Sequence, residues 1–225
     1  MAEKNKSKLE LAMEKLNKQN GIGSVMYLST ENTPDMVRIP SGSLGIDSIT
    51  GGGFPLGRMV EIYGWESSGK TTLVLQTIKN AQDMGLTCCF IDMEQAYDYS
   101  YATSLGVDNS KIIFLQPDNG EQALQSAREL IETGEIDVIA IDSIATLIPK
   151  SEIEGEVGDN QMGLHARLMS KGCRMISPIA NENDVLVLWT NQLREKIGVM
   201  FGDPRTTPGG NVANTESWEI GRAHV

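Results

Sequence analysis

The sequence has few cysteines and no long apolar run. Its three cysteines are an odd number, and their positions, Cys88, Cys89 and Cys173, show no metal-ligand spacing. This pattern argues against a disulfide framework and predicts reduced thiols. No apolar stretch reaches the roughly 18 residues that a membrane span needs, and the charged residues 1–8 lead into no apolar segment of a signal peptide. We therefore expect a cytoplasmic protein that does not enter a membrane.

Positive charge is also scarce. Lysine and arginine number 19 against 30 aspartates and glutamates, which gives a net charge of −11 and an isoelectric point near 4.7. This balance argues against a generic basic nucleic-acid binder, so any DNA contact has to come from a local patch or from backbone groups. The 225 residues, 40% of them hydrophobic, suffice for one domain with a real core and a small additional unit.

Residues 1–34 are expected to form a separate N-terminal arm. A helix is predicted over residues 7–19, because apolar side chains recur on one stripe of it. These side chains are Leu9, Ala12, Met13 and Leu16. Residues 25–28 are expected to add a short strand, and the polar residues 29–35 separate the arm from the main domain.

Beyond residue 58, short apolar runs alternate with helical patterns. Strands are expected at residues 59–63, 87–92, 111–115, 135–142 and 184–190. Helices are expected at residues 70–84, 119–133 and 162–180. Asp118 is expected to precede the second helix as its cap, with Glu121 in a capping box. Apolar strands separated by helices predict an α/β fold with a mainly parallel sheet flanked by helices.

A glycine-rich loop between the first of these strands and the following helix has the pattern of a phosphate-binding loop. The residues GWESSGKT, from Gly64 to Thr71, fit G-x-x-x-x-G-K-[ST]. Glycines let the chain curl so that backbone N–H groups and the helix N-terminus face a triphosphate. Lys70 is expected to reach the terminal phosphates, and the Thr71 hydroxyl to ligate Mg²⁺. The ATP-binding residues predicted in this segment are Gly64, Glu66, Ser67, Ser68, Gly69, Lys70, Thr71 and Thr72.

Carboxylates after two other strands extend this P-loop NTPase pattern. Asp142 ends an apolar strand and is expected to bind the Mg²⁺ through water. Asp92 and Glu94 stand at the end of another strand, where an open parallel sheet binds its ligands. Either could orient the water for hydrolysis. The residue pattern leaves open which of them does so, and whether they are simply solvated loop carboxylates.

Several longer runs resemble bacterial RecA recombinases. They include SGSLGID at 41–47, GRMVEIYG at 57–64, FIDMEQAYD at 90–98, IDSIATLIPKSEIEGEVGD at 141–159 and NQLREKIGVMFGDPRTTPGG at 191–210. The last two runs are long and specific, well beyond a shared phosphate loop. The resemblance covers about residues 8–211 and implies a RecA-like core that uses ATP and Mg²⁺.

The resemblance also implies roles for single residues. Glu94 matches the family's catalytic glutamate, which activates water, and Lys70 is expected to act with it. Gln192 matches the glutamine that senses the γ-phosphate and couples it to the DNA loops. Asp98 and Tyr101 match residues that lie beside the adenine.

Two segments resemble the family's DNA-binding loops, at residues 154–163 and 193–210. The first is acidic, so its glycine N–H groups rather than its charges are expected to meet phosphates. The second carries cations that can pair with phosphates, and apolar residues that either meet bases or pack on the sheet. Arg167 and Arg174 resemble DNA-channel arginines, although a solvated helix face fits them as well. The predicted DNA-binding residues are Gly155, Met162, Gly163, Arg167, Arg174, Arg194, Lys196, Ile197, Gly209 and Gly210.

Two departures from the family pattern stand out. Trp65 replaces the usual proline of the phosphate loop, at a position that is expected to face outward. Beyond Asn211 the resemblance stops, and we interpret residues 212–225 as a non-homologous tail of artefactual origin. On this interpretation the ATPase core of residues 35–211 is incomplete at its C-terminal end, and an exposed apolar edge of the sheet is expected.

By resemblance, the protein is expected to be a DNA-dependent ATPase that assembles as a filament on single-stranded DNA and pairs it with double-stranded DNA. Such an activity serves recombinational repair and the SOS response, and the arm of residues 1–34 is expected to pack on a neighbouring protomer. Two alternatives stay open. One is an ATP-binding fragment without activity, and the other is a relative with another task, such as a RadA-type factor or a helicase. The lack of an N-terminal zinc-ribbon cysteine set argues against the RadA type.

Overall fold

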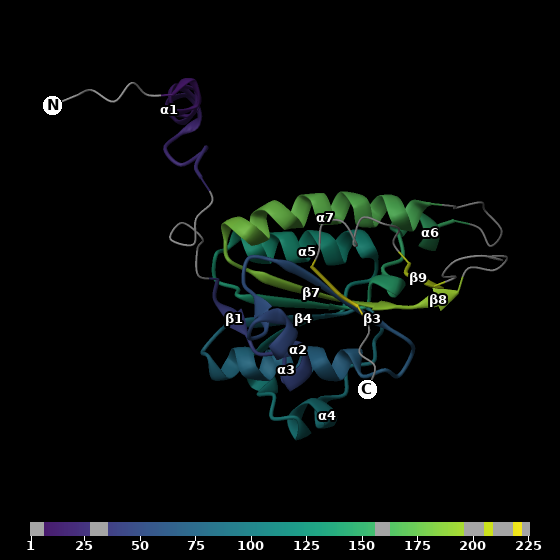
Figure 1. Cartoon of the computed structure of the whole chain (residues 1–225). Helices are drawn as coiled ribbons and strands as arrows, with labels where there is room; N and C mark the ends of the chain where they lie inside the picture. The colour runs from purple at the N-terminus through teal and green to yellow at the C-terminus, as the bar shows by residue number, and fades with distance from the viewer. Residues whose placement is uncertain (1–6, 28–35, 156–162, 196–204, 209–217, 222–225) are drawn as a thin grey trace. The chain divides into compact units, whose positions relative to one another are not determined.

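The structure is a computed structural model that describes residues 7–27, 36–155, 163–195, 205–208 and 218–221. The chain forms two compact units, Met1–Met36 and Val37–Val225 (Figure 1). No helix in these described ranges is long and apolar enough to cross a membrane.

The smaller unit contains helix α1, Lys8–Asn20, as the apolar stripe predicts. Ser7 caps the helix, because its hydroxyl accepts from the Glu10 N–H at 3.1 Å while the Glu10 carboxylate accepts from the Ser7 N–H at 2.6 Å. No residue of α1 is buried, and Leu9 of the stripe is 58% exposed.

The strand expected after this helix is not formed in its described part, residues 25–27. The Asn17 side chain occupies both backbone groups of Val25 instead. The Val25 N–H donates to Asn17 Oδ1 at 2.8 Å, and Asn17 Nδ2 donates to the Val25 carbonyl at 2.8 Å. These bonds use the groups that a strand would offer to a neighbour, so the chain turns back onto its own helix.

The larger unit is built on a six-stranded sheet whose neighbouring strands all run parallel, in the order β10-β3-β7-β6-β4-β5. The strands are β3 (Met59–Gly64), β4 (Cys88–Asp92), β5 (Ile112–Leu115), β6 (Val138–Asp142), β7 (Leu186–Gln192) and β10 (Trp218–Gly221). Every residue of β4 and β6 is buried, as expected for strands that are covered on both faces. The predicted α/β architecture is therefore confirmed.

Helices cover both faces of this sheet (Figure 1). They are α3 (Lys70–Asp83) on one face, and α5 (Gly120–Glu132) and α7 (Leu164–Glu182) on the other. On the α3 face, Val74 and Ile78 pack with Val60 and Leu188 of the sheet in one buried apolar cluster. A second cluster lies between the sheet and the pair α5 and α7. The strands alternate their side chains between these two cores, which holds the sheet rigid on both sides.

Strand β10 lies along the edge of the sheet at β3, so the exposed apolar edge that the sequence predicts is not at β3. Its residues pair in parallel with β3, with Trp218 opposite Val60 and Gly221 opposite Tyr63. The backbone groups on the outer side of β3 are therefore hydrogen-bonded to β10. Strand β10 lies within residues 212–225, the segment interpreted from the sequence as a tail.

The start of α5 differs from its prediction by one residue. Asn119 rather than Asp118 is the cap, since its side-chain oxygen lies 2.9 Å from the Gln122 N–H. Glu121 does not close a capping box. Its carboxylate instead accepts from the Lys150 N–H at 2.8 Å and so ties α5 to the segment that follows β6.

Short elements that the sequence patterns did not indicate connect these layers. They are β1 (Arg38–Ile39), α2 (Leu44–Thr50), β2 (Phe54–Pro55), α4 (Tyr99–Ser104), the 3₁₀ helices η2 (Asn109–Lys111) and η3 (Ile144–Thr146), α6 (Lys150–Ile153), β8 (Arg194–Glu195) and β9 (Arg205–Thr206). β1 pairs antiparallel with β2, and β8 pairs antiparallel with β9.

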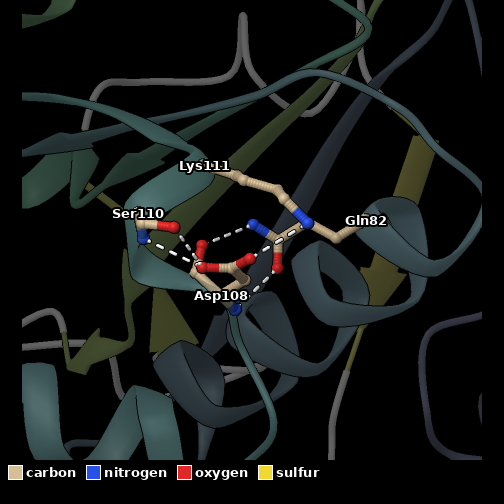
Figure 2. A network of polar contacts seen from close by, with 4 residues as sticks. All are labelled: Gln82, Asp108, Ser110 and Lys111. Carbon is tan, nitrogen blue, oxygen red and sulfur yellow. Dashed lines mark hydrogen bonds and ion pairs between the residues drawn. The ribbon is translucent and has the colours of Figure 1, made fainter.

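Figure 2 shows how the turn that leads into β5 is fixed to the end of α3. Asp108 caps η2, with its carboxylate accepting from the Ser110 N–H at 3.1 Å and from the Ser110 hydroxyl at 2.6 Å. The Gln82 amide bonds both backbone groups of Asp108 at 2.9 Å, and Lys111 pairs with its carboxylate at 3.0 Å. This network sets the start of β5 relative to α3.

Candidate functional site

One edge of the sheet collects the polar ends of its strands. Because β3, β4, β6 and β7 are parallel, Gly64, Asp92, Asp142 and Gln192 all end their strands on the same side. A cavity of about 420 Å³ opens there. Its lining consists of Glu66, Ser67, Ser68, Gly69, Lys70, Thr71, Thr72, Glu94, Tyr101, Asp142 and Gln192. Of the thirteen residues predicted for ATP and catalysis, eleven are in that lining, and Gly64 and Asp98 are not, so the sequence patterns converge on one place.

The loop from β3 to α3 needs its glycines at two points. A Cβ on Gly64 would lie 2.6 Å from the Ser68 hydroxyl, so a side chain there would collide with the curled loop. Gly69 is the N-cap of α3 and has φ 83°, a left-handed conformation that favours glycine. The loop thereby turns the free N–H groups of the first turn of α3 toward the cavity.

Two groups of this loop are suited to an anion. The Ser68 hydroxyl is buried and has no hydrogen-bond partner among the described residues. A buried hydroxyl without a partner is costly, and a phosphate oxygen in the cavity could accept its hydrogen bond. Lys70 Nζ donates to the carbonyls of Trp65 at 2.8 Å and Gly64 at 3.3 Å, inside the loop. Burial lowers the pKa of Lys70, although the negative charges of Asp142, Glu94 and Glu66 oppose this shift. These donors fit the phosphates of a nucleotide.

Trp65 is 45% exposed, so its ring faces outward from the loop, as expected. Its carbonyl, not its side chain, takes part in the site through Lys70.

Asp142 lies between two threonine hydroxyls. Thr71 Oγ1 donates to Asp142 Oδ2 at 2.7 Å, and Thr190 Oγ1 donates to Asp142 Oδ1 at 2.5 Å. Burial raises the pKa of Asp142, while the bonds from Thr190 and Thr71 lower it and the charges of Glu94 and Asp92 raise it. A hard cation beside this carboxylate would favour its charged form.

The donor set at this point fits Mg²⁺ held together with phosphates. Thr71 and Asp142 supply a hydroxyl and a carboxylate oxygen, the ligand types that Mg²⁺ prefers. Among the described residues, no group of three or more histidine, cysteine, aspartate or glutamate side chains forms a separate metal site. A Mg²⁺ ion whose coordination shell is completed by a nucleotide and water needs only a few protein ligands.

Glu94 and Asp92 occupy different environments. Glu94 lines the cavity, and its Oε1 accepts from the Ser143 hydroxyl at 2.5 Å and from Gln192 Nε2 at 3.4 Å. Asp92 is only 2% exposed and accepts from the Ala96 and Tyr97 N–H groups and from Gln116 Nε2, at 3.3, 3.2 and 3.1 Å. Asp92 therefore holds the loop that carries Glu94, whereas Glu94 faces the space where a nucleotide would react.

The two residues predicted beside the adenine behave differently. Tyr101 lines the cavity, and its hydroxyl lies 2.9 Å from Thr72 Oγ1. Asp98 is the N-cap of α4, with its carboxylate accepting from the Tyr101 N–H at 2.9 Å. Asp98 is not in the cavity lining, so it reaches this site through the position of Tyr101.

The predicted DNA-binding residues are spread over several elements. Gly155 follows α6, Gly163 is the N-cap of α7, Arg167 and Arg174 are exposed on α7, and Arg194 is exposed in β8. The remaining predicted positions, Met162, Lys196, Ile197, Gly209 and Gly210, lie outside the described residues. None of the described members lines the nucleotide cavity.

Sequence reasoning missed two polar contacts of the site. Ser143 and Thr190 bond Glu94 and Asp142, respectively, and both are fully buried. A signal was present, because a hydroxyl residue follows Asp142 directly and another lies near the end of an apolar strand. Their partners are 49 and 48 positions away, and no local pattern gives that pairing.

Comparison with known proteins agrees with this geometry. The model of the RecA N-terminal domain family matches residues 7–216. A protein RecA of Cytophaga hutchinsonii is 54% identical over 204 residues, which cover 90% of this chain and 58% of that protein. Proteins of the same name from Oceanobacillus iheyensis and Mannheimia haemolytica are 50% and 51% identical, over 91% and 93% of this chain and 59% and 57% of their own lengths. The chain thus spans somewhat over half the length of these curated relatives.

Proposed function

The chain belongs to the RecA family, and from this premise we propose that it is the ATP-binding core of a DNA recombinase. In this proposal the chain binds ATP and Mg²⁺ and hydrolyses ATP in response to single-stranded DNA. It assembles on that DNA as a filament and pairs it with homologous double-stranded DNA, as recombinational repair and the SOS response require, in the cytoplasm.

The observation that carries the proposal is the meeting of four polar groups at one cavity. Lys70, Glu94, Asp142 and Gln192 come from four different segments and all line it. A phosphate loop alone would support many nucleotide-binding functions. The addition of Glu94 and of Gln192, 3.4 Å apart, supports a hydrolase whose catalytic carboxylate is in contact with a residue at the base of a DNA loop.

The chain's own residues have distinct tasks in this proposal. The loop N–H groups and Lys70 bind and orient the phosphates, because their positive charge faces the negative oxygens. Glu94 Oε1 orients the attacking water and accepts its proton, and the Ser143 hydroxyl, 2.5 Å away, keeps this carboxylate facing the cavity. Thr71 and Asp142 would hold Mg²⁺, which when bound neutralises charge on the phosphate oxygens.

DNA contact is proposed for the exposed cations and for the two loops. Arg167 and Arg174 on α7 and Arg194 in β8 are exposed, so they can pair with phosphates without a cost of burial. Since the net charge is −11, these local cations rather than the overall field have to supply the attraction.

The alternative of an ATP-binding fragment without DNA response keeps one supporting fact. The chain spans 58% of the Cytophaga hutchinsonii relative, so activities of the whole relative need not reside in it. A RadA-type factor or a helicase is less well supported, because the three relatives described above, at 50–54% identity, are each named RecA.

The test is ATP hydrolysis with and without single-stranded DNA, measured on two proteins. One is the 225-residue chain. The other, the extended chain, joins residues 1–211 to the C-terminal segment of the Cytophaga hutchinsonii relative. Lys70→Ala in each protein is the control for hydrolysis by contaminants.

We expect DNA-stimulated hydrolysis in the extended chain that Lys70→Ala abolishes. If the 225-residue chain is silent while the extended chain responds, the recombinase function stands and needs the additional segment. If the extended chain hydrolyses ATP at a rate that DNA does not change, the DNA-dependent function is wrong.

A further inference from the structure

A buried carboxylate and a buried amide lie next to the nucleotide site without being part of its cavity. Glu61 in β3 and Asn191 in β7 are both 0% exposed, although they belong to the polar residue types that are rarely found so deep. Asn191 Nδ2 donates to Glu61 Oε1 at 2.7 Å, across neighbouring strands of the sheet. Burying a polar pair costs desolvation free energy, which the hydrogen bonds of the pair have to offset. We therefore ask which parts of the fold and of the site these bonds connect.

The amide of Asn191 joins three separate parts of the chain. Besides the bond to Glu61, its Nδ2 donates to the Pro208 carbonyl at 3.0 Å, and its Oδ1 accepts from the Gln192 N–H at 2.9 Å. Both N–H groups and the oxygen of the Asn191 side chain are therefore hydrogen-bonded. These partners identify the nitrogen and the oxygen of the amide, because two acceptors face Nδ2 and one donor faces Oδ1. Aspartate in this place would lose both donated bonds, and a hydrocarbon residue would lose all three.

These three bonds connect the nucleotide end of β7 to both stems of the loop that follows it. Gln192 pairs with Gly64, the first residue of the phosphate loop, and the Leu193 N–H donates to the Gly64 carbonyl at 3.0 Å. The outgoing stem β8 and the returning stem β9 pair at Arg194 and Thr206. Among the described residues, the bond from Asn191 ties Pro208, just beyond β9, back to β7.

We infer that Asn191, held in place by Glu61, is a positioning residue that transmits a shift of Gln192 to the returning stem of the loop at Pro208. This inference rests on the proposed function, because it concerns how nucleotide binding changes DNA affinity. Gln192 contacts Glu94 through its side chain and Asn191 through its backbone N–H, so a displacement at the γ-phosphate end moves the amide. The amide in turn carries Pro208, whereas Glu61 stays fixed within the sheet.

The chain allows a set of variants that separate this role from stability. Glu61→Gln keeps an acceptor oxygen for Asn191 and leaves the bond to Pro208 intact. Asn191→Asp removes both donors and sets two acceptors against each other. The double variant Glu61→Gln with Asn191→Asp restores a bond between the strands, because the new amide can donate to the new carboxylate. It leaves the Pro208 carbonyl without its donor.

The measured quantity is the coupling ratio, which is the dissociation constant for fluorescent oligo-dT with ADP divided by that with a non-hydrolysable ATP analogue. It is measured on the 225-residue chain and on the extended chain, together with the melting temperature and the dissociation constant of the analogue. Thr77→Val is the matched control. Thr77 is also fully buried and its hydroxyl bonds a carbonyl, that of Leu73, but this bond lies within α3 rather than in β7 or the loop stems.

We expect Glu61→Gln and Thr77→Val to keep the coupling ratio of the unmodified chain within about twofold. The double variant should regain most of the melting temperature that Asn191→Asp loses, and yet have a coupling ratio about fivefold or more below that of the unmodified chain. Affinity for the analogue should change by less than about twofold in the double variant, since the cavity is unaltered.

A purely structural role gives a different result. In that case the coupling ratio follows the melting temperature, and a double variant with restored stability and an unchanged ratio would overturn the inference while leaving the proposed function in place. If the unmodified extended chain has a coupling ratio of one, the proposed function itself fails, and the inference fails with it.

Discussion

The nucleotide edge of the sheet and the segments proposed to bind DNA, called the DNA-facing segments, differ in how their residues are held. At the nucleotide edge, side chains from α3, β6, β7 and the segment after β4 meet at one cavity and bond each other over 2.5 to 3.4 Å. The described residues proposed to bind DNA are exposed and come from the end of α6, from α7 and from β8; they are Gly155, Gly163, Arg167, Arg174 and Arg194. The first region is held by its own hydrogen bonds, and the second would offer separate contacts to a long partner such as DNA.

This difference follows from what each ligand demands. A triphosphate concentrates its charge at one point, so a preorganised set of donors binds it best. A DNA strand presents a row of phosphates, so contacts are additive and each one contributes little. Substitutions at the nucleotide edge should therefore have large, specific effects, and substitutions in the DNA-facing segments should have small, graded ones.

Lys70→Ala tests the largest effect. The variant loses the one ammonium that lines the cavity, among the described residues, so we expect kcat/KM for ATP to fall about a hundredfold or more. Steady-state hydrolysis with the extended chain measures this. Lys79→Ala is the matched control, because Lys79 lies in the same helix but pairs with Asp83 at the surface. A similar loss in both variants would show that the helix, not the charge in the cavity, matters.

Glu94→Gln should separate binding from chemistry within the nucleotide edge. The amide cannot accept the proton of water, so kcat should fall about a hundredfold, while the dissociation constant of ATP stays within about threefold. Single-turnover hydrolysis and nucleotide titration measure the two quantities. Glu129→Gln, on the exposed face of α5, controls for the loss of a negative charge. An unchanged kcat would remove Glu94 from its proposed role.

Asp142→Asn should stabilise the chain in the absence of Mg²⁺, and more so at higher pH. Burial raises the pKa of Asp142 above its ordinary value of 3.8, so the folded chain binds this proton more tightly than the unfolded chain does. Its contribution to stability is present below pH 3.8 and is lost as the pH rises through the folded-state pKa. The asparagine variant lacks this loss and should melt about 2–4 °C higher at neutral pH.

Thermal scans between acid and neutral pH, with and without MgATP, measure this effect. With MgATP the order should reverse, because the variant lacks the carboxylate that favours the ion. A variant that melts below the unmodified chain at neutral pH without Mg²⁺ would contradict the raised pKa of Asp142.

Arg194→Ala tests the smallest effect, in the DNA-facing region. Loss of one phosphate contact should weaken oligo-dT binding about two- to fivefold and reduce the slope of log affinity against log salt by about 0.7. Affinity for ATP should not change. Arg128→Ala is the control, since Arg128 pairs with Glu132 on α5. A loss of more than a hundredfold would show that this region, too, depends on one fixed point, and the contrast between the regions would be wrong.

The fold was largely readable from local patterns. Apolar runs and helical stripes predicted the five strands from β3 to β7 and the helices α1, α3, α5 and α7 to within about three residues. The strand after α1 and the cap of α5 were wrong, because the asparagine side chains of Asn17 and Asn119 bond the backbone and decide these turns. Pairing of β10 with β3 was not foreseen, since its partner is far away in the sequence.

The sequence by itself determined the phosphate loop, the apolar strands and the carboxylates that follow them, because these depend on residue order over a few positions. Only the tertiary structure decided that Asp92 is enclosed while Glu94 faces the cavity, and that Thr190 and Ser143 hold the two carboxylates. It alone joined Asn191 to Glu61, which is 130 positions away, and to Pro208. Such contacts arise when parallel strands bring their ends to one edge, and no local pattern records which distant side chain will lie opposite.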